Sequence, residues 1–130
     1  MKRLWVWREV DAPVAALWAL LVDVEQWPCW GPSVRAAAID GGQLALGATG
    51  TVTTIVGVNL PFEITEYDPC VGWAWKVAGM PATDHRLTPL GEDRCRIGFG
   101  VPWPVAPYLI VCRTALKRLE RLAALDEVGT

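Results

Sequence analysis

The chain has 130 residues, 52% of them hydrophobic, so it is large enough to bury one core and too apolar to be disordered. Its net charge of −2, with no basic run before the last predicted helix, argues against a nucleic-acid-binding surface. No apolar stretch is long enough to cross a bilayer and no signal-peptide pattern precedes the first strand, so we expect one cytoplasmic domain over residues 1–130.

The first quarter of the chain predicts one strand followed by two short helices. Residues 4–10 are rich in strand-favouring side chains. Residues 13–23 space apolar side chains along one helical face, and their opening proline suits a first helical turn. A second short helix or turn follows from Val24. Pro28 and Pro32 end it, because proline cannot continue a helix without losing a backbone hydrogen bond.

The segment 25–32 (EQWPCWGP) carries two tryptophans, two prolines and a cysteine, and it loosely resembles a thiol-redox site. No cysteine of the chain lies within a dozen residues of another, so neither a redox dithiol nor a zinc knuckle is indicated. We therefore interpret the segment as a stiff aromatic corner and the cysteines as structural. The four cysteines are Cys29, Cys70, Cys95 and Cys112.

The middle of the chain predicts six short strands separated by glycine- and proline-rich turns. They lie near 34–39, 50–57, 61–67, 71–78, 83–88 and 94–101. Links this short favour antiparallel hairpins, so together with the first strand they predict a seven-stranded meander.

A long amphipathic helix is predicted after the proline-rich stretch 101–107 and runs to about Leu125. As the only long helix expected, it must cover the concave face of the sheet. A helix about 10 Å wide cannot fill a strongly curved seven-stranded sheet. The remaining space is either a cavity or is plugged by large side chains.

Several stretches resemble the START-like, helix-grip superfamily, and are most similar to its polyketide cyclase/dehydrase and lipid-transport branch. They are 10–30 (VDAPVAALWALLVDVEQWPCW), 47–50 (GATG), 64–69 (ITEYDP), 72–75 (GWAW) and 83–89 (TDHRLTP). The resemblance runs from about residue 3 to 125. It implies an α+β helix-grip fold, in which a seven-stranded antiparallel curved sheet wraps around a long C-terminal helix and two short helices lie between strands 1 and 2. It also implies that the Trp-Pro-x-Trp corner is a structural element near the cavity mouth.

Strand alternation predicts which side chains face the interior. The inward set is an apolar wall with a few polar points, which is typical of small-molecule sites. We predict as ligand-binding Phe62, Ile64, Glu66, Trp73, Trp75, Thr83, His85, Leu87, Ile97 and Phe99 from the strands, with Tyr108 and Cys112 from the last helix. Hairpin pairing is expected to set His85 opposite Trp75 or Val77, and Glu66 near Trp73.

Alternatives remain open for the polar and aromatic members of this set. His85, the single histidine, is a candidate acid or base, but a buried histidine bonded to a neighbour is the simpler interpretation. Glu66 could orient His85, or more simply lie exposed at a strand end. Trp73 and Trp75 could stack on a ligand or form the core itself. Trp27, Trp30 and Trp103 are expected to be scaffold, although Trp103 could instead line the entrance.

Three functions follow, in order of preference. The first is binding or carriage of a hydrophobic small molecule, such as a lipid, polyketide or aromatic metabolite. The second is a cyclase/dehydrase-like enzyme using His85, and the third is a protein-interaction module, which a filled interior would favour. No motif or ligand set indicates a cofactor or metal, and monomer and homodimer both remain open.

Overall fold

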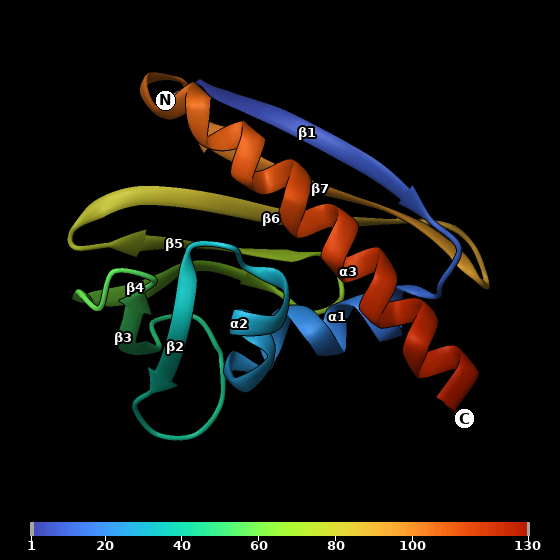
Figure 1. The fold of residues 1–130 in the computed structure, drawn as a ribbon, viewed down its shortest axis with the longest axis horizontal. Coiled ribbons are helices and arrows are strands. Elements are labelled where there is room, and N and C mark those ends of the chain that lie inside the picture. The colour runs from blue at the N-terminus through green and yellow to red at the C-terminus, as the bar shows by residue number, and fades with distance from the viewer. Residues whose placement is uncertain (1, 130) are drawn as a thin grey trace.

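The computed structural model describes residues 2–129 and consists of one curved antiparallel sheet with helices on its concave face (Figure 1). The sheet has seven strands in the order β1-β7-β6-β5-β4-β3-β2, so β2 to β7 form successive hairpins and β1 pairs with β7. The strands are β1 (Arg3–Val10), β2 (Val34–Ile39), β3 (Thr49–Thr54), β4 (Asn59–Asp68), β5 (Gly72–Val77), β6 (Met80–Gly91) and β7 (Arg94–Pro102). The helical segments are α1 (Val14–Val22), η1 (Val24–Gln26), α2 (Trp27–Trp30), η2 (Trp103–Tyr108) and α3 (Leu109–Gly129).

This architecture confirms the predicted helix-grip fold. The helix α3 runs diagonally across the concave face of the sheet, while α1 and α2 lie beside it over the β2–β5 half (Figure 1). The core is the apolar layer between them. Its most deeply buried members are Leu17, Leu21, Ile64, Trp73, Cys95, Ile97, Leu119 and Ala123.

The Trp-Pro-x-Trp corner is α2, and backbone carbonyls of α1 hold it in place. The indole Nε1 of Trp27 donates to the carbonyl of Leu21 at 2.9 Å, and that of Trp30 donates to the carbonyl of Leu20 at 3.0 Å. Both rings are buried, whereas Cys29 between them is exposed and forms no disulfide. The interpretation of this segment as an aromatic corner is therefore confirmed.

On the convex face, two tryptophans of β1 lie over glycines of β7. Trp5 and Trp7 stack with ring centroids 5.1 Å apart, and they pair with Gly100 and Gly98 respectively. A Cβ atom at position 98 would lie 2.2 Å from the ring of Trp7. Glycine is therefore required there so that the indole can lie against the sheet.

The expected strand 50–57 is too long, because the chain already turns at residues 55–58. Gly57 adopts a φ of +87°, and the backbone N–H of Gly57 donates to the carbonyl of Thr54. The apolar residues of this turn suggested strand, although they lie at an exposed tip. The following strand β4 begins at Asn59, two residues before the expected start, so Pro61 lies within it and pairs with Thr51 of β3.

Candidate ligand-binding site

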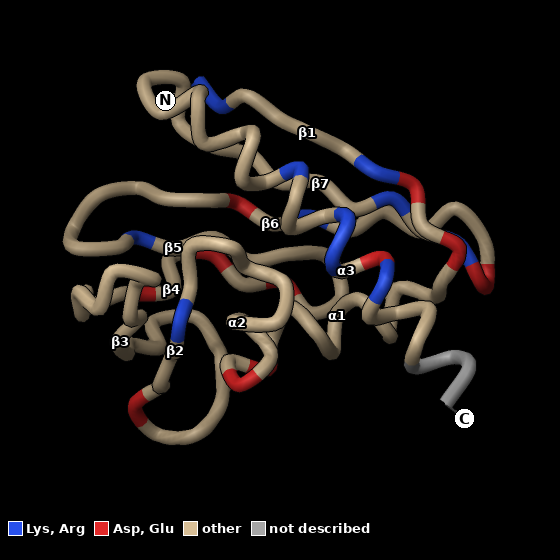
Figure 2. Tube along the Cα trace, in the orientation of Figure 1, with Lys and Arg blue, Asp and Glu red and all other residues tan. Residues whose placement is uncertain are grey.

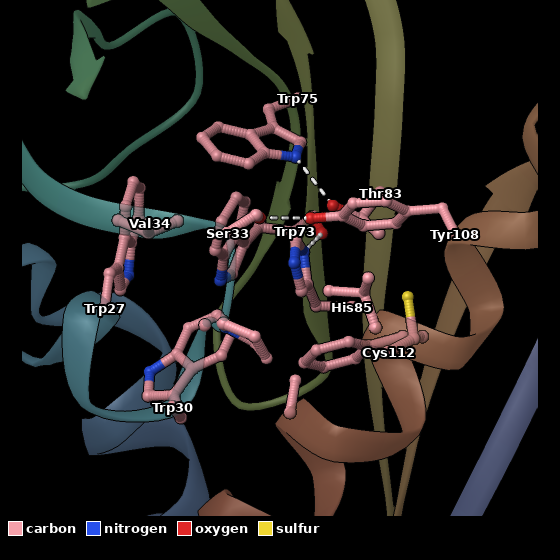
Figure 3. A pocket seen from close by; sticks show the side chains of 15 residues that line it. Trp27, Trp30, Ser33, Val34, Trp73, Trp75, Thr83, His85, Tyr108 and Cys112 are labelled. Carbon is pink, nitrogen blue, oxygen red and sulfur yellow. Dashed lines mark hydrogen bonds between the residues drawn. The ribbon is translucent and has the colours of Figure 1, made fainter. Parts of the chain in front are cut away.

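A small cavity lies between the centre of the sheet, the α2–β2 connection and the first turns of α3 (Figure 3). Its volume is about 30 Å³, which is room for a water molecule or two. It is lined by Trp27, Trp30, Gly31, Pro32, Ser33, Val34, Trp73, Trp75, Thr83, His85, Phe99, Tyr108, Val111, Cys112 and Ala115.

The space beside α3 is not a large cavity, so this part of the prediction is wrong. The reason is that α2 as well as α3 fills the concave face. The ring of Trp27 lies 5.3 Å from those of both Trp73 and Trp75, measured between centroids. Trp30 packs against Phe99 at 5.7 Å. The plugging side chains are the tryptophans of the corner, which we had expected to serve only as scaffold.

The mouth of the cavity is closed by a contact between two hydroxyl groups. Ser33, which precedes β2, and Tyr108, at the end of η2, have their side-chain oxygens 2.5 Å apart (Figure 3). Beneath this contact lies Cys112 of α3, which is buried. Burial raises the pKa of the Cys112 thiol to about 12, so this sulfur is a protonated, apolar part of the wall.

His85 is buried at the floor of the cavity as a neutral imidazole. Its Nδ1 lies 3.1 Å from the carbonyl oxygen of Trp73. Since a carbonyl only accepts, Nδ1 carries the proton and Nε2 is left as an acceptor. Burial lowers the pKa of His85 to about 3, and the positive charges of Arg3 and Arg86 act in the same direction.

The two central tryptophans differ in their hydrogen bonding. The Nε1 of Trp75 donates to the hydroxyl of Thr83 at 2.9 Å. The Nε1 of Trp73 is buried and has no hydrogen-bond partner among the described residues. A buried polar group without a partner is rare in folded proteins and marks a place where one can be supplied. Trp73 and His85 both line the cavity, but the unpaired Nε1 atom of Trp73 is itself buried and is not exposed to the cavity space.

Glu66 does not belong to this site, so its predicted inward position is wrong. A bulge between Ile64 and Glu66 shifts the strand by one residue and turns Glu66 to the convex face. Its carboxylate is exposed there and accepts a hydrogen bond from Arg86 at 2.9 Å. It cannot orient His85.

The position of the β5–β6 turn sets the partner of His85. Val77 pairs with Met80, so the turn lies at residues 78–79, and a bulge between Ala74 and Lys76 then places His85 opposite Trp73 rather than opposite Trp75 or Val77. The imidazole consequently stacks on the Trp73 indole, with ring centroids 3.9 Å apart. The predicted pairing failed because it placed the turn too late in the chain, since turn position fixes hairpin register.

Seven of the predicted residues line the cavity, namely Trp73, Trp75, Thr83, His85, Phe99, Tyr108 and Cys112. Four others are buried in the core without reaching it, namely Phe62, Ile64, Leu87 and Ile97. Residue 27, residues 30–34, Val111 and Ala115 also line the cavity, although no prediction included them. Helical spacing from Tyr108 and Cys112 could have identified the last two.

Two classes of site find no support in the described part of the chain. Among residues 2–125, whose side chains are described, no three histidine, cysteine, aspartate or glutamate side chains gather in a way that could hold a metal ion. Within the same range, no helix has the length and apolar character needed to span a membrane.

A curved antiparallel sheet that grips a C-terminal helix, with an apolar site between them, defines the helix-grip class. The sequence matches the family described as polyketide cyclase/dehydrase and lipid transport over residues 1–125, and the chain belongs to that family. No curated protein matches the sequence at a significant level.

Solved structures share the fold at low sequence identity. XoxI from Bacillus cereus is 12% identical with a TM-score of 0.75, covering 98% of this chain and 99% of that one. NE0264 from Nitrosomonas europaea is 20% identical with a TM-score of 0.69, covering 97% and 96%. The di-domain ARO/CYC BexL from the BE-7585A biosynthetic pathway is 16% identical with a TM-score of 0.72, covering 96% of this chain and 47% of BexL.

Proposed function

We propose that the protein binds a small hydrophobic molecule that has a polar end, between the sheet, α2 and the first turns of α3. The family and the apolar wall support a hydrophobic ligand. The rings of Trp73, Trp75 and Phe99 offer faces and edges for a flat apolar body. Thr83 and His85 supply polar points on the same floor, and Tyr108 and Cys112 close the top.

The observation that carries this proposal is the unpaired indole N–H of Trp73, a residue that lines the cavity; the N–H is buried in this conformation and becomes accessible to a ligand when the site opens. A buried donor without a partner costs about 1–3 kcal/mol. A ligand hydroxyl can accept from this N–H and donate to the bare Nε2 of His85. A ligand with such a group therefore gains affinity that a purely apolar one does not.

Binding of any organic ligand requires the mouth to open, since the closed cavity holds only a water or two. The segment that must move is η2 with Tyr108. It contains Pro104 and Pro107, which donate no backbone hydrogen bonds, and Val105 departs from helical geometry within it. Separation of Tyr108 from Ser33 is the opening step.

Native mass spectrometry of the purified protein first shows whether an apolar ligand co-purifies with it. Titrations with 2-naphthol and with naphthalene then test this proposal. We expect 2-naphthol to bind about tenfold more tightly, a difference of about 1.4 kcal/mol. Trp73→Phe keeps an aromatic ring but removes the donor, so it should reduce this preference and spare naphthalene binding. Trp7→Phe, at an exposed tryptophan on the convex face outside both the cavity and η2, is the matched control. Equal affinity for both probes would contradict the polar-end assignment.

The two other functions lead to different outcomes of these experiments. An enzyme using His85 as acid or base is less well supported, because its pKa is low and no carboxylate orients it. His85→Gln should leave probe affinity within a few fold in a carrier but abolish turnover in a cyclase. A protein-interaction module is favoured by the filled interior, and it predicts neither a co-purifying ligand nor probe binding.

A further inference from the structure

The surface around the cavity mouth is apolar and lacks acidic residues. We define the mouth rim as residue 2 and residues 33–35, 54–60, 76–83 and 101–110. Backbone contacts join these segments. The N–H of Ile55 donates to the carbonyl of Ser33, the Ser33 side chain meets Tyr108, and the N–H of Trp103 donates to the carbonyl of Lys2.

Large apolar side chains project from the mouth rim into solvent. They come from the β3–β4 turn, the β5–β6 turn, η2 and the first residues of α3, which gather at the left side of the molecule in Figure 1. Val56 is 78% exposed and Ile110 is 70% exposed. The full set is Ile55, Val56, Val58, Met80, Trp103, Val105, Tyr108 and Ile110. Apolar exposure on this scale, concentrated beside one opening, is typical of an interaction surface.

Charge is distributed unevenly between the mouth rim and the rest of the chain. The rim contains Lys2, Arg35 and Lys76 and no aspartate or glutamate, although the whole chain has 14 acidic residues and a net charge of −2. None of these three basic residues has an ion-pair partner among the described residues. Most acidic residues lie away from the rim, for example beyond the end of β1 and in the β6–β7 turn at the opposite end (Figure 2). Glu63 is an exception, because it is exposed and lies opposite Lys76 on β4.

We propose that the mouth rim docks the protein onto an anionic lipid surface. Loop tips with apolar side chains can insert between headgroups, and unpaired basic side chains around them are attracted to anionic lipids. The acidic remainder of the chain is repelled by the same surface, which orients the mouth towards it. Docking would serve the transfer of a ligand between the bilayer and the cavity. This role rests on the function proposed above, whereas the docking itself does not.

Flotation with lipid vesicles tests the docking. Vesicles of phosphatidylcholine alone are compared with vesicles containing about 30% phosphatidylglycerol, at low and at high salt. We expect the protein to float with the anionic vesicles at low salt and to be released from them at high salt. The proposal is overturned if the protein floats equally with both kinds of vesicle, or if it does not float with the anionic ones. It is also overturned if the rim captures a protein partner and the protein does not float with any vesicle.

Two pairs of exposed substitutions serve as test and control. Val56→Ser with Trp103→Ser should reduce flotation at least about tenfold, because both side chains leave the proposed insertion surface. Leu46→Ser with Leu90→Ser removes comparably exposed apolar side chains outside the rim and should have no effect. A decrease that is the same for both pairs overturns the assignment of the rim.

A cavity variant separates this proposal from the proposed function. Ala115→Phe places a ring in the cavity wall, so it should abolish binding of 2-naphthol while leaving flotation unchanged. Flotation without probe binding in the wild type would contradict the proposed function alone. Probe binding without flotation would contradict the docking alone. A thermal melt of each variant shows that it is folded.

Discussion

The imidazole of His85 lies flat on the indole of Trp73, with ring centroids 3.9 Å apart, while the edge of Phe99 meets it at 4.7 Å. The ring is 2% exposed and neutral. Protonation would place a positive charge in this apolar layer. The same arrangement that presents Nε2 to the cavity therefore makes the fold sensitive to acid.

We expect the free energy of unfolding to fall as the pH drops below about 6.5. In this range His85 binds a proton in the unfolded chain, whereas in the folded protein it binds one only at about pH 3. Between these limits the loss is about 1.4 kcal/mol per pH unit. Urea denaturation at a series of pH values measures it. His85→Gln removes the titrating group, so its stability should depend less on pH across this window. The same acid dependence in the variant would show that other groups cause it.

Opening of the mouth should be visible as reactivity of Cys112. Tyr108→Phe removes the hydroxyl that meets Ser33. In a Cys29→Ser, Cys70→Ser background, we expect iodoacetamide to label Cys112 several-fold faster in this variant than in the protein with Tyr108. The thiol must become solvated before its pKa, now about 12, can fall towards the usual range. Mass spectrometry of chymotryptic peptides measures Cys112 and Cys95 separately.

Cys95 provides the internal control for this experiment. It is fully buried and does not line the cavity, so local opening should leave it unlabelled. Equal acceleration at both cysteines would indicate global destabilisation. A bound probe such as 2-naphthol should protect Cys112 selectively, and lack of protection would place the probe elsewhere.

The sequence predicted the elements of this fold well because its periodicities are strong. Alternation placed Ile97 and Phe99 inside, and both are buried. It failed for Glu66, because a single-residue bulge that alternation cannot reveal precedes it. The partner of His85 was wrong for another reason, because the turn between β5 and β6 lies at residues 78–79 and turn position fixes the register.

The size of the cavity could not be predicted either. It depends on where the indoles of Trp27 and Trp30 point, and this is fixed by their bonds to the carbonyls of Leu21 and Leu20. These carbonyls lie at the end of a helix, where they have no intrahelical partner. Only the relative placement of α1 and α2 brings donor and acceptor together. The residue pattern identified the corner but not the direction of its rings.

The packing of Trp7 on Gly98 predicts a large effect from a small substitution. Gly98→Ala puts a methyl group 2.2 Å from the indole, so we expect it to destabilise the fold by about 1–3 kcal/mol as the ring is displaced. Gly91→Ala is the matched control, since its Cβ meets nothing within 4 Å. Urea denaturation measures both.

A double-mutant cycle identifies the cause of this effect. In a Trp7→Ala background the methyl group at position 98 has free space, so the cost of Gly98→Ala should be much smaller than in the wild type. An unchanged cost would mean that the substitution strains the β7 backbone itself, and the indole would then not be the reason for glycine at this position.

The last prediction concerns Arg86, which lies between a buried and an exposed carboxylate on the convex face. Its Nε is 2.9 Å from Oδ1 of Asp84, and its Nη2 is 2.9 Å from Oε2 of Glu66. Burial raises the pKa of Asp84, and the charge of Arg86 opposes that rise. Arg86→Met should destabilise the fold by about 2–4 kcal/mol, because it leaves the Asp84 carboxylate without its nearest partner. Glu66→Gln should cost less than about 1 kcal/mol, because that carboxylate is exposed.

The pH dependence of Arg86→Met separates loss of charge pairing from loss of packing. The pKa of Asp84 in the folded variant should rise further above the unfolded value, so folding takes up a proton and stability should recover as the pH falls towards 5. Adding Asp84→Asn should remove this recovery and restore much of the stability at neutral pH, since no buried charge remains. A cost that is independent of pH and persists in the double variant would assign the effect to the lost packing of the Arg86 side chain.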